Sequence, residues 1–349
     1  MMTTPTTVKP PRLRPGDTVG VFTPSFPAHV RFREKYLHGL AVLRGLGFEV
    51  VEGDLTRALG DEGYRSGSPR ERAEEFMGLV RNPRVRALVS CVGGSNSASL
   101  IPHLDFDEIR ATPKIVCGYS DVTSLHLAIL AYAGLRTFYG PAVMPSFGEW
   151  PDVLPETRDS FLDAALGRGP ASRELTPPAR WSNHFRDAAS EAWKDVPRAF
   201  QPNPGWRSLH PGEVTAPLVV ANLNTLMTSA GTDVFPDVEG RVLLIEEMDA
   251  ALSEEERDLR HLERLGVFDA VAGLIVGKPE RYDAQGAPFG YDDLVLEIVG
   301  EGRPYPVVTG FDCGHTVPML TLAEHTTVTV TARADEGARV RVEEHMVTD

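Results

Sequence analysis

Short apolar runs alternate with amphipathic stretches through the first half of the chain. The apolar runs cover residues 18–23, 48–52, 86–92 and 114–119, and the amphipathic stretches cover residues 32–44, 69–80 and 121–133. Runs of four to eight apolar residues suit buried strands, and the longer amphipathic stretches suit helices. Strands that alternate with helices are typical of a mostly parallel, doubly wound sheet. The pattern therefore predicts an α/β fold whose N-terminal domain, residues 1–165, is Rossmann-like.

The pattern changes between residues 167 and 212. Prolines recur in this segment without a strand or helix period, and they are interleaved with Trp181, Trp193 and Trp206. An irregular stretch of this length is either a linker or a functional loop. Large apolar side chains are uncommon in solvated linkers, so the tryptophans favour a functional loop. We predict that residues 166–215 form a linker that also serves as an active-site loop.

Regular patterns return in the last part of the chain. Residues 241–246 and 272–277 are apolar runs, and residues 253–265 have the spacing of a helix. Residues 326–344 alternate Val or Thr with polar side chains, as an antiparallel hairpin does. Residues 216–349 are therefore predicted to form a second, smaller α/β domain with a mixed, barrel-like sheet.

Composition narrows the class of protein. The chain has 349 residues, 42% of them hydrophobic and 24% charged, which suits folded domains with full cores. Its formal net charge of −14 makes it a poor partner for nucleic acids or anionic membranes. No secretory signal or membrane span is visible, and the 3 cysteines contain no C-x-x-C pair. We therefore expect a cytoplasmic protein with reduced thiols.

A metal site is not expected. The 10 histidines are scattered without the spacing of ligands, and there is no H-E-x-x-H motif. Cys91 and Cys117 lie inside apolar runs, which favours a place in the core over a chemical role. The sequence therefore predicts neither metal nor cofactor.

One candidate nucleophile lies where an apolar run meets a helical stretch, in the run Gly118-Tyr119-Ser120-Asp121. A strand-to-helix turn projects a serine hydroxyl from the sheet edge and brings the amides of the helix N-terminus beside a developing oxyanion. The G-x-S-x-G elbow would have a second glycine, and here Val122 takes its place. Ser120 could equally be a helix N-cap, which is the commoner use of serine at this position.

A pair of glycines ends the preceding apolar run. Gly93 and Gly94 are followed by Ser95 and Asn96. Glycines let the backbone approach a ligand closely, and their amides could complete an oxyanion hole with that of Asp121. An ordinary turn between strand and helix is the alternative.

Two further residues suit the remaining roles of a hydrolase. Glu246 and Glu247 close an apolar strand at its carboxyl end, where α/β folds place their sites, and Glu246 follows the apolar run directly. His315 lies in a loop between small and polar neighbours, so it is a candidate general base. The alternatives are carboxylates on the rim and an exposed histidine. Cys313, two residues from His315, leaves a cysteine nucleophile open.

Several runs in fixed order resemble the LD-carboxypeptidase family of serine peptidases, and within it the microcin C immunity branch (MccF-type). The resemblance covers nearly the whole chain. The runs are Gly93–Ser97, Gly118–Thr123, Asn222–Leu226, Leu244–Glu247, Gly266–Asp269, Gly277–Glu280 and Phe311–Thr316.

The resemblance implies a Ser-His-Glu triad of Ser120, His315 and Glu246 with no metal or cofactor. It also implies a site between two domains and a homodimer. Cell-wall members of the family remove a terminal D-amino acid from muropeptides. The microcin branch cleaves the amide between an acidic amino acid and a modified adenylate, and stacks the nucleobase on a loop tryptophan. The loop sequence Asp-Cys-Gly-His-Thr around His315 and the tryptophan-bearing segment favour the second branch.

The same resemblance assigns the residues that would contact a substrate. The expected oxyanion hole consists of the Gly94 and Asp121 amides, and the expected substrate-binding residues are Gly93, Ser95, Asn96, Trp193, Asn222, Lys278 and Glu280. Trp193 fits the base-stacking position best, with Trp181 as its alternative. The branch normally has Gly-Gly before Asn222, where this chain has Val220 and Ala221.

Three functions follow from this reading. The first is hydrolysis of aminoacyl-adenylate-type amides such as processed microcin C, for self-immunity or detoxification. The second is a muropeptide LD-carboxypeptidase of cell-wall recycling, and the third is a non-catalytic module that binds nucleotides or peptides.

Overall fold

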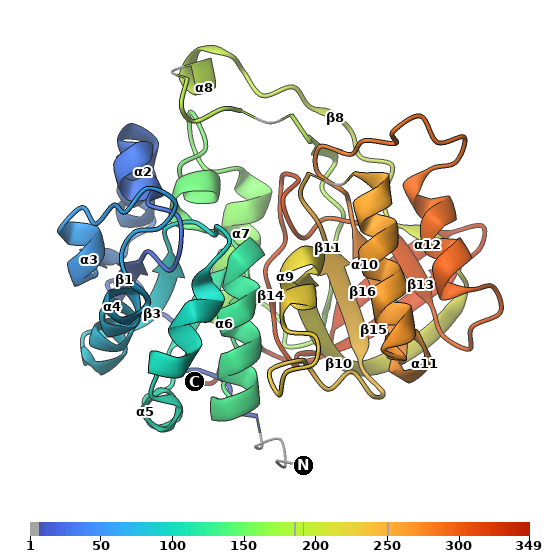
Figure 1. The fold of residues 1–349 in the computed structure, drawn as a ribbon, viewed down its shortest axis with the longest axis horizontal. Coiled ribbons are helices and arrows are strands. Elements are labelled where there is room, and N and C mark those ends of the chain that lie inside the picture. Colours follow the sequence, from blue (N-terminus) through green and yellow to red (C-terminus); the bar gives the residue numbers. More distant parts are fainter. Residues whose placement is uncertain (1–6, 185, 191, 250) are drawn as a thin grey trace.

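The computed structural model describes residues 7–184, 186–190, 192–249 and 251–349. The first six residues of the predicted N-terminal domain lie outside this part. The chain forms two α/β domains that lie side by side (Figure 1). Among the described residues, no helix is long and apolar enough to cross a membrane.

The N-terminal sheet has the strand order β14-β5-β4-β3-β1-β2. Its strands are β1 (Thr18–Phe22), β2 (Glu49–Glu52), β3 (Val85–Ser90), β4 (Ile115–Gly118), β5 (Phe138–Tyr139) and β14 (Leu322–Ala323). All neighbours are parallel except β14, which pairs antiparallel with β5. The predicted parallel, doubly wound domain is therefore confirmed, with one strand added from far along the chain.

Helices surround this sheet. They are α1 (Ala28–Arg31), α2 (Arg33–Gly45), α3 (Asp54–Arg57), α4 (Pro69–Arg81), α5 (Phe106–Ala111), α6 (Thr123–Ala128) and α7 (Pro155–Leu166). The start of α4 shows how the sequence sets these bounds. Ser68 and Glu71 form a capping box and Pro69 stands in the first turn, so the free backbone amides of the helix start find acceptors.

The C-terminal sheet is mixed, in the order β6-β16-β15-β10-β11-β12-β13-β9. Its main strands are β9 (Arg207–His210), β10 (Gly212–Asn222), β11 (Val242–Glu246), β12 (Gly273–Gly277), β13 (Val307–Phe311), β15 (Thr327–Arg333) and β16 (Gly337–Val342). The amide of Ala338 in β16 donates to the carbonyl of Trp206, just before β9, at 3.1 Å. The two ends of the sheet thus approach each other, as in a barrel-like sheet. The helices of this domain are α9 (Leu223–Thr228), α10 (Leu252–Arg264), α11 (Val267–Ala270) and α12 (Tyr291–Val299).

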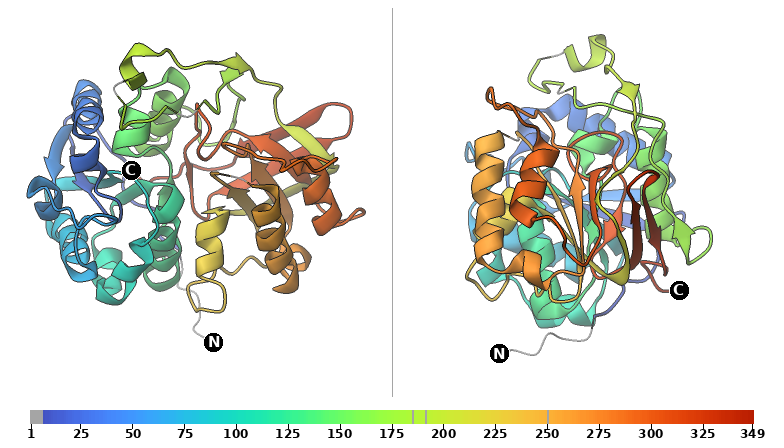
Figure 2. Two further views of the ribbon diagram at one scale, coloured as in Figure 1. Left: turned by 45° about the horizontal axis from the view of Figure 1, so that its top comes forward. Right: turned by 90° about the vertical axis from the view of Figure 1, so that its right-hand side faces the viewer.

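The described part of residues 166–215, which we call the crossing segment, runs across the top of both domains in Figure 1, in yellow-green. Figure 2 shows the same course. The crossing segment carries β6 (Arg173–Glu174), β7 (Arg180–Trp181), α8 (Ala192–Asp195) and β8 (Gln201–Pro202). Its two ends join the C-terminal sheet, because β6 pairs with β16 and β9 pairs with β13. The predicted domain limits near residues 165 and 215 stay predictions.

The hydrophobic core continues from one domain to the other. Phe138 and Tyr139 of β5 belong to the same cluster of buried side chains as Val220 of β10 and Leu244 of β11. This shared core holds the ends of β4 and β11, which carry the candidate nucleophile and carboxylate, in one fixed arrangement.

A buried ion pair anchors the loop that follows β13. Asp312 is fully buried and accepts hydrogen bonds from Lys278 and, at 2.9 Å, from the Trp206 indole nitrogen. Lys278 also donates to the Gly310 carbonyl at 2.6 Å. Burying two charges is tolerable only when each is paired and hydrogen-bonded, as they are here.

We predict that Lys278→Met destabilises the fold, because it leaves the Asp312 carboxylate buried without its cation. Breaking such a pair costs about 3–5 kcal/mol in the free energy of unfolding. Denaturant unfolding measures this loss. The control is Lys194→Met, which removes a partly exposed pair with Glu34 and should cost only about 0–1 kcal/mol. Equal, small losses in both variants would contradict the anchoring role.

Candidate active site

Ser120 stands on a sharp turn between β4 and α6. The turn Ser120–Val122 is a short 3₁₀ helix, and the φ angle of Ser120 is +64°, in the left-handed region. Non-glycine residues rarely adopt this region, and strained serines at strand-to-helix turns are a feature of serine hydrolases. Gly118 makes the turn possible, because a Cβ there would lie 2.5 Å from the Ser90 hydroxyl.

Glu246 and His315 meet at the carboxyl end of β11. The Nδ1–H of His315 donates to Glu246 Oε2 at 2.7 Å, and the backbone amide of His315 donates to the same oxygen at 3.1 Å. This bond leaves Nε2 as the ring nitrogen that can accept a proton. Neighbouring Glu247 binds instead to the Asn222 side chain and the Asn224 amide.

Two glycines let the histidine loop come this close. A Cβ on Gly314, whose φ is +127°, would lie 2.2 Å from Glu246 Oε2. A Cβ on Gly277 would lie 2.7 Å from Glu246 Cβ and 2.9 Å from the Cys313 carbonyl. Any side chain at either position would push the loop away from the carboxylate.

Tyr139 joins the nucleophile turn to the carboxylate. Its hydroxyl donates to Glu246 Oε1 and accepts a hydrogen bond from the Ser120 amide at 3.1 Å. Asn222 also donates to Glu246 Oε1, at 3.3 Å. Nothing in the sequence pattern singled out Tyr139, because a lone tyrosine at the end of a two-residue strand carries no motif.

The glycine turn after β3 lies directly beside the nucleophile. A Cβ on Gly93 would be 3.0 Å from Ser120 Cβ and 3.2 Å from both Ser120 Oγ and the Asp121 amide nitrogen. Glycine at this position therefore leaves the space beside the Ser120 hydroxyl open. The Asp121 carboxylate ties the segment after these glycines to the nucleophile turn, because it accepts hydrogen bonds from the amides of Asn96 and Ser97, each at 2.9 Å.

These groups face a cavity of about 340 Å³. Its lining includes Ser120, His315, Gly93, Gly94 and Glu280. Among the hydrogen bonds of the described residues, none joins Ser120 to His315. In unliganded enzymes such catalytic contacts are commonly long and tighten when substrate binds.

Acidic neighbours change the acid–base behaviour of this cavity. Burial acts to lower the pKa of His315, but Glu246, Glu280 and Glu247 together raise it above its ordinary value. Burial raises the pKa of Glu280 to about 7, while His315 acts in the opposite direction. Burial and the nearby Glu246 raise the pKa of Glu247 to about 6.

Comparison with known proteins shows which family the chain belongs to. The sequence profile of the LD-carboxypeptidase N-terminal domain matches residues 19–140, and that of the C-terminal domain matches residues 215–330. The chain belongs to the LD-carboxypeptidase family. It is a serine peptidase, which confirms the resemblance inferred from the motifs.

Individual relatives cover most of the chain. A putative carboxypeptidase of Vibrio cholerae is 39% identical over 307 residues, 87% of this chain and 89% of that protein. The microcin C7 self-immunity protein MccF of Escherichia coli is 38% identical over 308 residues, 88% of both chains. A solved structure of MccF with aspartyl sulfamoyl adenosine superposes with a TM-score of 0.90 at 35% identity, covering 98% of this chain and 100% of that one.

Other predicted site residues of this LD-carboxypeptidase family member lie beside the cavity instead of lining it. Ser95 donates its amide to the Ser25 hydroxyl, and Asn96 accepts a hydrogen bond from Arg72. Asn222 caps α9 and holds the two carboxylates at the end of β11. Lys278 is turned to Asp312. Their predicted contacts with substrate stay predictions, and the structure gives each a supporting place in the fold.

The tryptophans of the crossing segment are likewise absent from the cavity lining. Trp193 is buried edge-on against Trp150, with ring centroids 5.9 Å apart. The centre of its ring lies 5.7 Å from the Nζ atom of Lys35, and Lys35 does line the cavity. Trp181 lies over Lys278, and Trp206 is buried against Phe311. The stacking of a nucleobase on Trp193 or Trp181 stays a prediction.

The surroundings of Cys313 disfavour a cysteine nucleophile. Cys313 is buried, and burial together with Glu246 and Asp312 raises the pKa of its thiol well above the ordinary value, so it stays protonated. Among the residues outside the four gaps in the description, no group of three or more His, Cys, Asp or Glu side chains could hold a metal ion.

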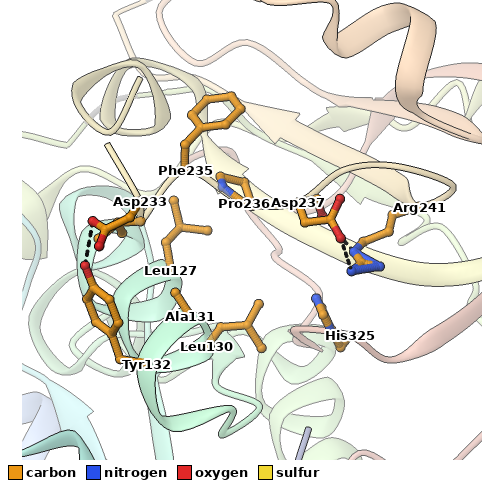
Figure 3. Close-up of a pocket in the computed structure, with 11 residues that line it drawn as sticks. Leu127, Leu130, Ala131, Tyr132, Asp233, Phe235, Pro236, Asp237, Arg241 and His325 are labelled. Carbon is orange, nitrogen blue, oxygen red and sulfur yellow. Dashed lines mark hydrogen bonds and ion pairs between the residues drawn. The ribbon is translucent and has the colours of Figure 1, made fainter. Parts of the chain in front are cut away.

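A second, smaller cavity of about 120 Å³ lies between the loop before β11 and residues 127–132, at the end of α6 and in the helical turn Ile129–Ala133 that follows it (Figure 3). His325 and the Asp237–Arg241 ion pair stand on one side of it, and Tyr132 donates to Asp233 on the other. None of the predicted site residues lines this cavity.

We predict that the acid limb of kcat/KM against pH lies above the ordinary histidine pKa of about 6.5. His315 accepts a proton only when neutral, and its pKa is raised, so activity falls as pH drops through that raised value. Glu280→Gln removes a negative charge that favours the protonated ring, so it should move the limb to lower pH. Tyr139→Phe removes the hydrogen bond that the tyrosine hydroxyl donates to Glu246. The carboxylate then attracts the protonated His315 ring more strongly, so this variant should move the limb to higher pH.

The opposite directions of these two shifts make the test specific. A merely destabilised enzyme would lose activity without a shift of the limb. Limbs that coincide in wild type and both variants would contradict the electrostatic assignment of His315.

Proposed function

We propose that this serine peptidase hydrolyses the amide bond of aminoacyl-nucleotide-type substrates, with Ser120 as nucleophile, His315 as general base and Glu246 as the residue that orients it. The observation that carries the proposal is the convergence of a strained serine and a carboxylate-bound histidine on one cavity. Hydrolases that form an acyl-enzyme commonly combine such a serine with a histidine that is held by a carboxylate.

The reaction begins when Ser120 Oγ attacks the carbonyl carbon of the substrate amide. His315 Nε2 takes the hydroxyl proton, and Glu246 stabilises the imidazolium that forms. The ring then gives this proton to the nitrogen of the leaving group as the C–N bond breaks. A water molecule, activated by the same ring, cleaves the acyl-enzyme and releases the acid.

The negative charge on the carbonyl oxygen needs fixed donors. The amides of Gly94 and Asp121 are our candidates, since Asp121 follows Ser120 in the chain, Gly94 lines the same cavity, and backbone amides in turns supply donors without reorganisation. The amide of Ser120 donates to the Tyr139 hydroxyl, so it is not a candidate donor to the carbonyl oxygen.

The substrate class draws support from similarity to MccF, which has been solved with aspartyl sulfamoyl adenosine. On this proposal the physiological task is self-immunity or detoxification of aminoacyl-nucleotide antibiotics, carried out in the cytoplasm by a homodimer. A muropeptide LD-carboxypeptidase is the alternative, because the family as a whole bears that name.

We predict that purified enzyme cleaves aspartyl or glutamyl sulfamoyl adenosine with a higher kcat/KM than an L-D muropeptide tested in parallel. Ser120→Ala should lower the rate on the order of a million-fold, because loss of a triad serine removes the covalent route. Chromatographic detection of the released amino acid measures both.

The matched control is Ser253→Ala, on an exposed residue of α10, which should keep wild-type activity. Preference for the muropeptide would contradict the nucleotide proposal and favour cell-wall recycling. Binding of either compound without any cleavage would contradict both and favour a non-catalytic module.

A further inference from the structure

Three cationic side chains line the active-site cavity together. Lys35 comes from α2, while Arg186 and Arg198 come from the segment that crosses both domains. We call these three residues the cationic wall. Lys35 is 6% exposed and the side chains of Arg186 and Arg198 are 3% and 11% exposed, so the charges are held largely away from water.

One carboxylate serves all three cations. Glu149, itself buried, accepts hydrogen bonds from Arg186 Nη1 and, at 2.7 Å, from Arg198 Nη2. It also attracts Lys35, whose pKa is nevertheless lowered to about 8, by burial first and also by the two guanidinium groups. The described acids that line the cavity are Glu280 and Asp187, and Asp187 is exposed and accepts a hydrogen bond from the amide of Ala189.

The guanidinium groups keep unused donors. Arg186 Nε and Nη2 and Arg198 Nε are buried and have no hydrogen-bond partner. Nε and Nη2 of Arg186 form one edge of the planar guanidinium group, which is the edge that binds a carboxylate or phosphate with two parallel hydrogen bonds. Buried donors of this strength are seldom left unpaired in a purely structural ion cluster.

We propose that the cationic wall binds an oxyanion group of the substrate. A nucleotide phosphate and a peptide carboxylate are both oxyanions. Either would supply the negative charge and the acceptor oxygens that the cationic wall still lacks after pairing with Glu149. The proposal rests on the proposed function in that the same cavity holds the reacting amide. It adds a charge requirement: substrates lacking an anionic group at this position bind poorly.

The test measures binding instead of turnover, so it does not depend on which amide the enzyme cleaves. Titration calorimetry in the Ser120→Ala background compares two ligand pairs: adenosine monophosphate with adenosine, and an L-D peptide bearing a free terminal carboxylate with its terminal amide. We expect the anionic member of one pair to bind about 10- to 100-fold more tightly, as hydrogen bonds to charged groups do.

Arg186→Met should abolish this advantage while leaving the uncharged member unaffected, and Arg186→Lys should restore only part of it, because an ammonium group lacks the two-pronged edge. Lys35→Met is a second variant in case Arg186→Met does not fold. The matched control is Arg33→Met, on an exposed residue of α2 outside the cavity, which should keep the advantage.

The outcome also distinguishes the source of the oxyanion. Loss of the advantage only in the adenosine pair assigns the cationic wall to a nucleotide phosphate, and loss only in the peptide pair assigns it to a terminal carboxylate. Equal affinities within both pairs in the Ser120→Ala protein, or an advantage that survives in both Arg186→Met and Lys35→Met, would overturn the proposal. Failure to cleave adenylates would contradict the proposed function without touching this result.

Discussion

The candidate site depends on one buried carboxylate. Glu246 is 1% exposed, and its two oxygens receive the His315 ring and amide on one side and the Tyr139 hydroxyl and Asn222 amide on the other. These donors come from both domains, so the carboxylate joins the turn that carries Ser120 to the loop that carries His315. These donors offset the cost of burying the carboxylate. Of the acidic groups that raise the pKa of His315 against the effect of burial, Glu246 has the largest effect.

The main elements of the fold could be predicted because they follow local rules, and the same rules point to the candidate site residues. The apolar runs at residues 86–92 and 114–119 are strands β3 and β4, and Ser120 and Glu246 each stand at the carboxyl end of a strand, where parallel sheets place their sites. Several features depend instead on contacts between distant segments. Pairing of β14 with the N-terminal sheet leaves no signal in a two-residue strand, and Tyr139 carries no motif.

The residues least predictable from the sequence are those whose direction depends on the crossing segment. Lys278 donates to Asp312 and Trp193 packs on Trp150, so neither side chain lines the cavity, and their contacts with substrate stay predictions. Two arginines of the crossing segment, Arg186 and Arg198, do line the cavity. An irregular segment has no period that shows which side chains point inward, so composition alone could indicate a functional loop but not its inward face.

The most direct test of the account is covalent labelling of the enzyme by a serine-directed fluorophosphonate, followed by mass spectrometry of its peptides. The account predicts a single adduct on Ser120, formed at least about tenfold more slowly in Glu246→Gln, because without its carboxylate the histidine is a poorer base for that serine. An adduct on another residue, or labelling of Ser120→Ala at the wild-type rate, would contradict the claim that Ser120, His315 and Glu246 form the catalytic unit.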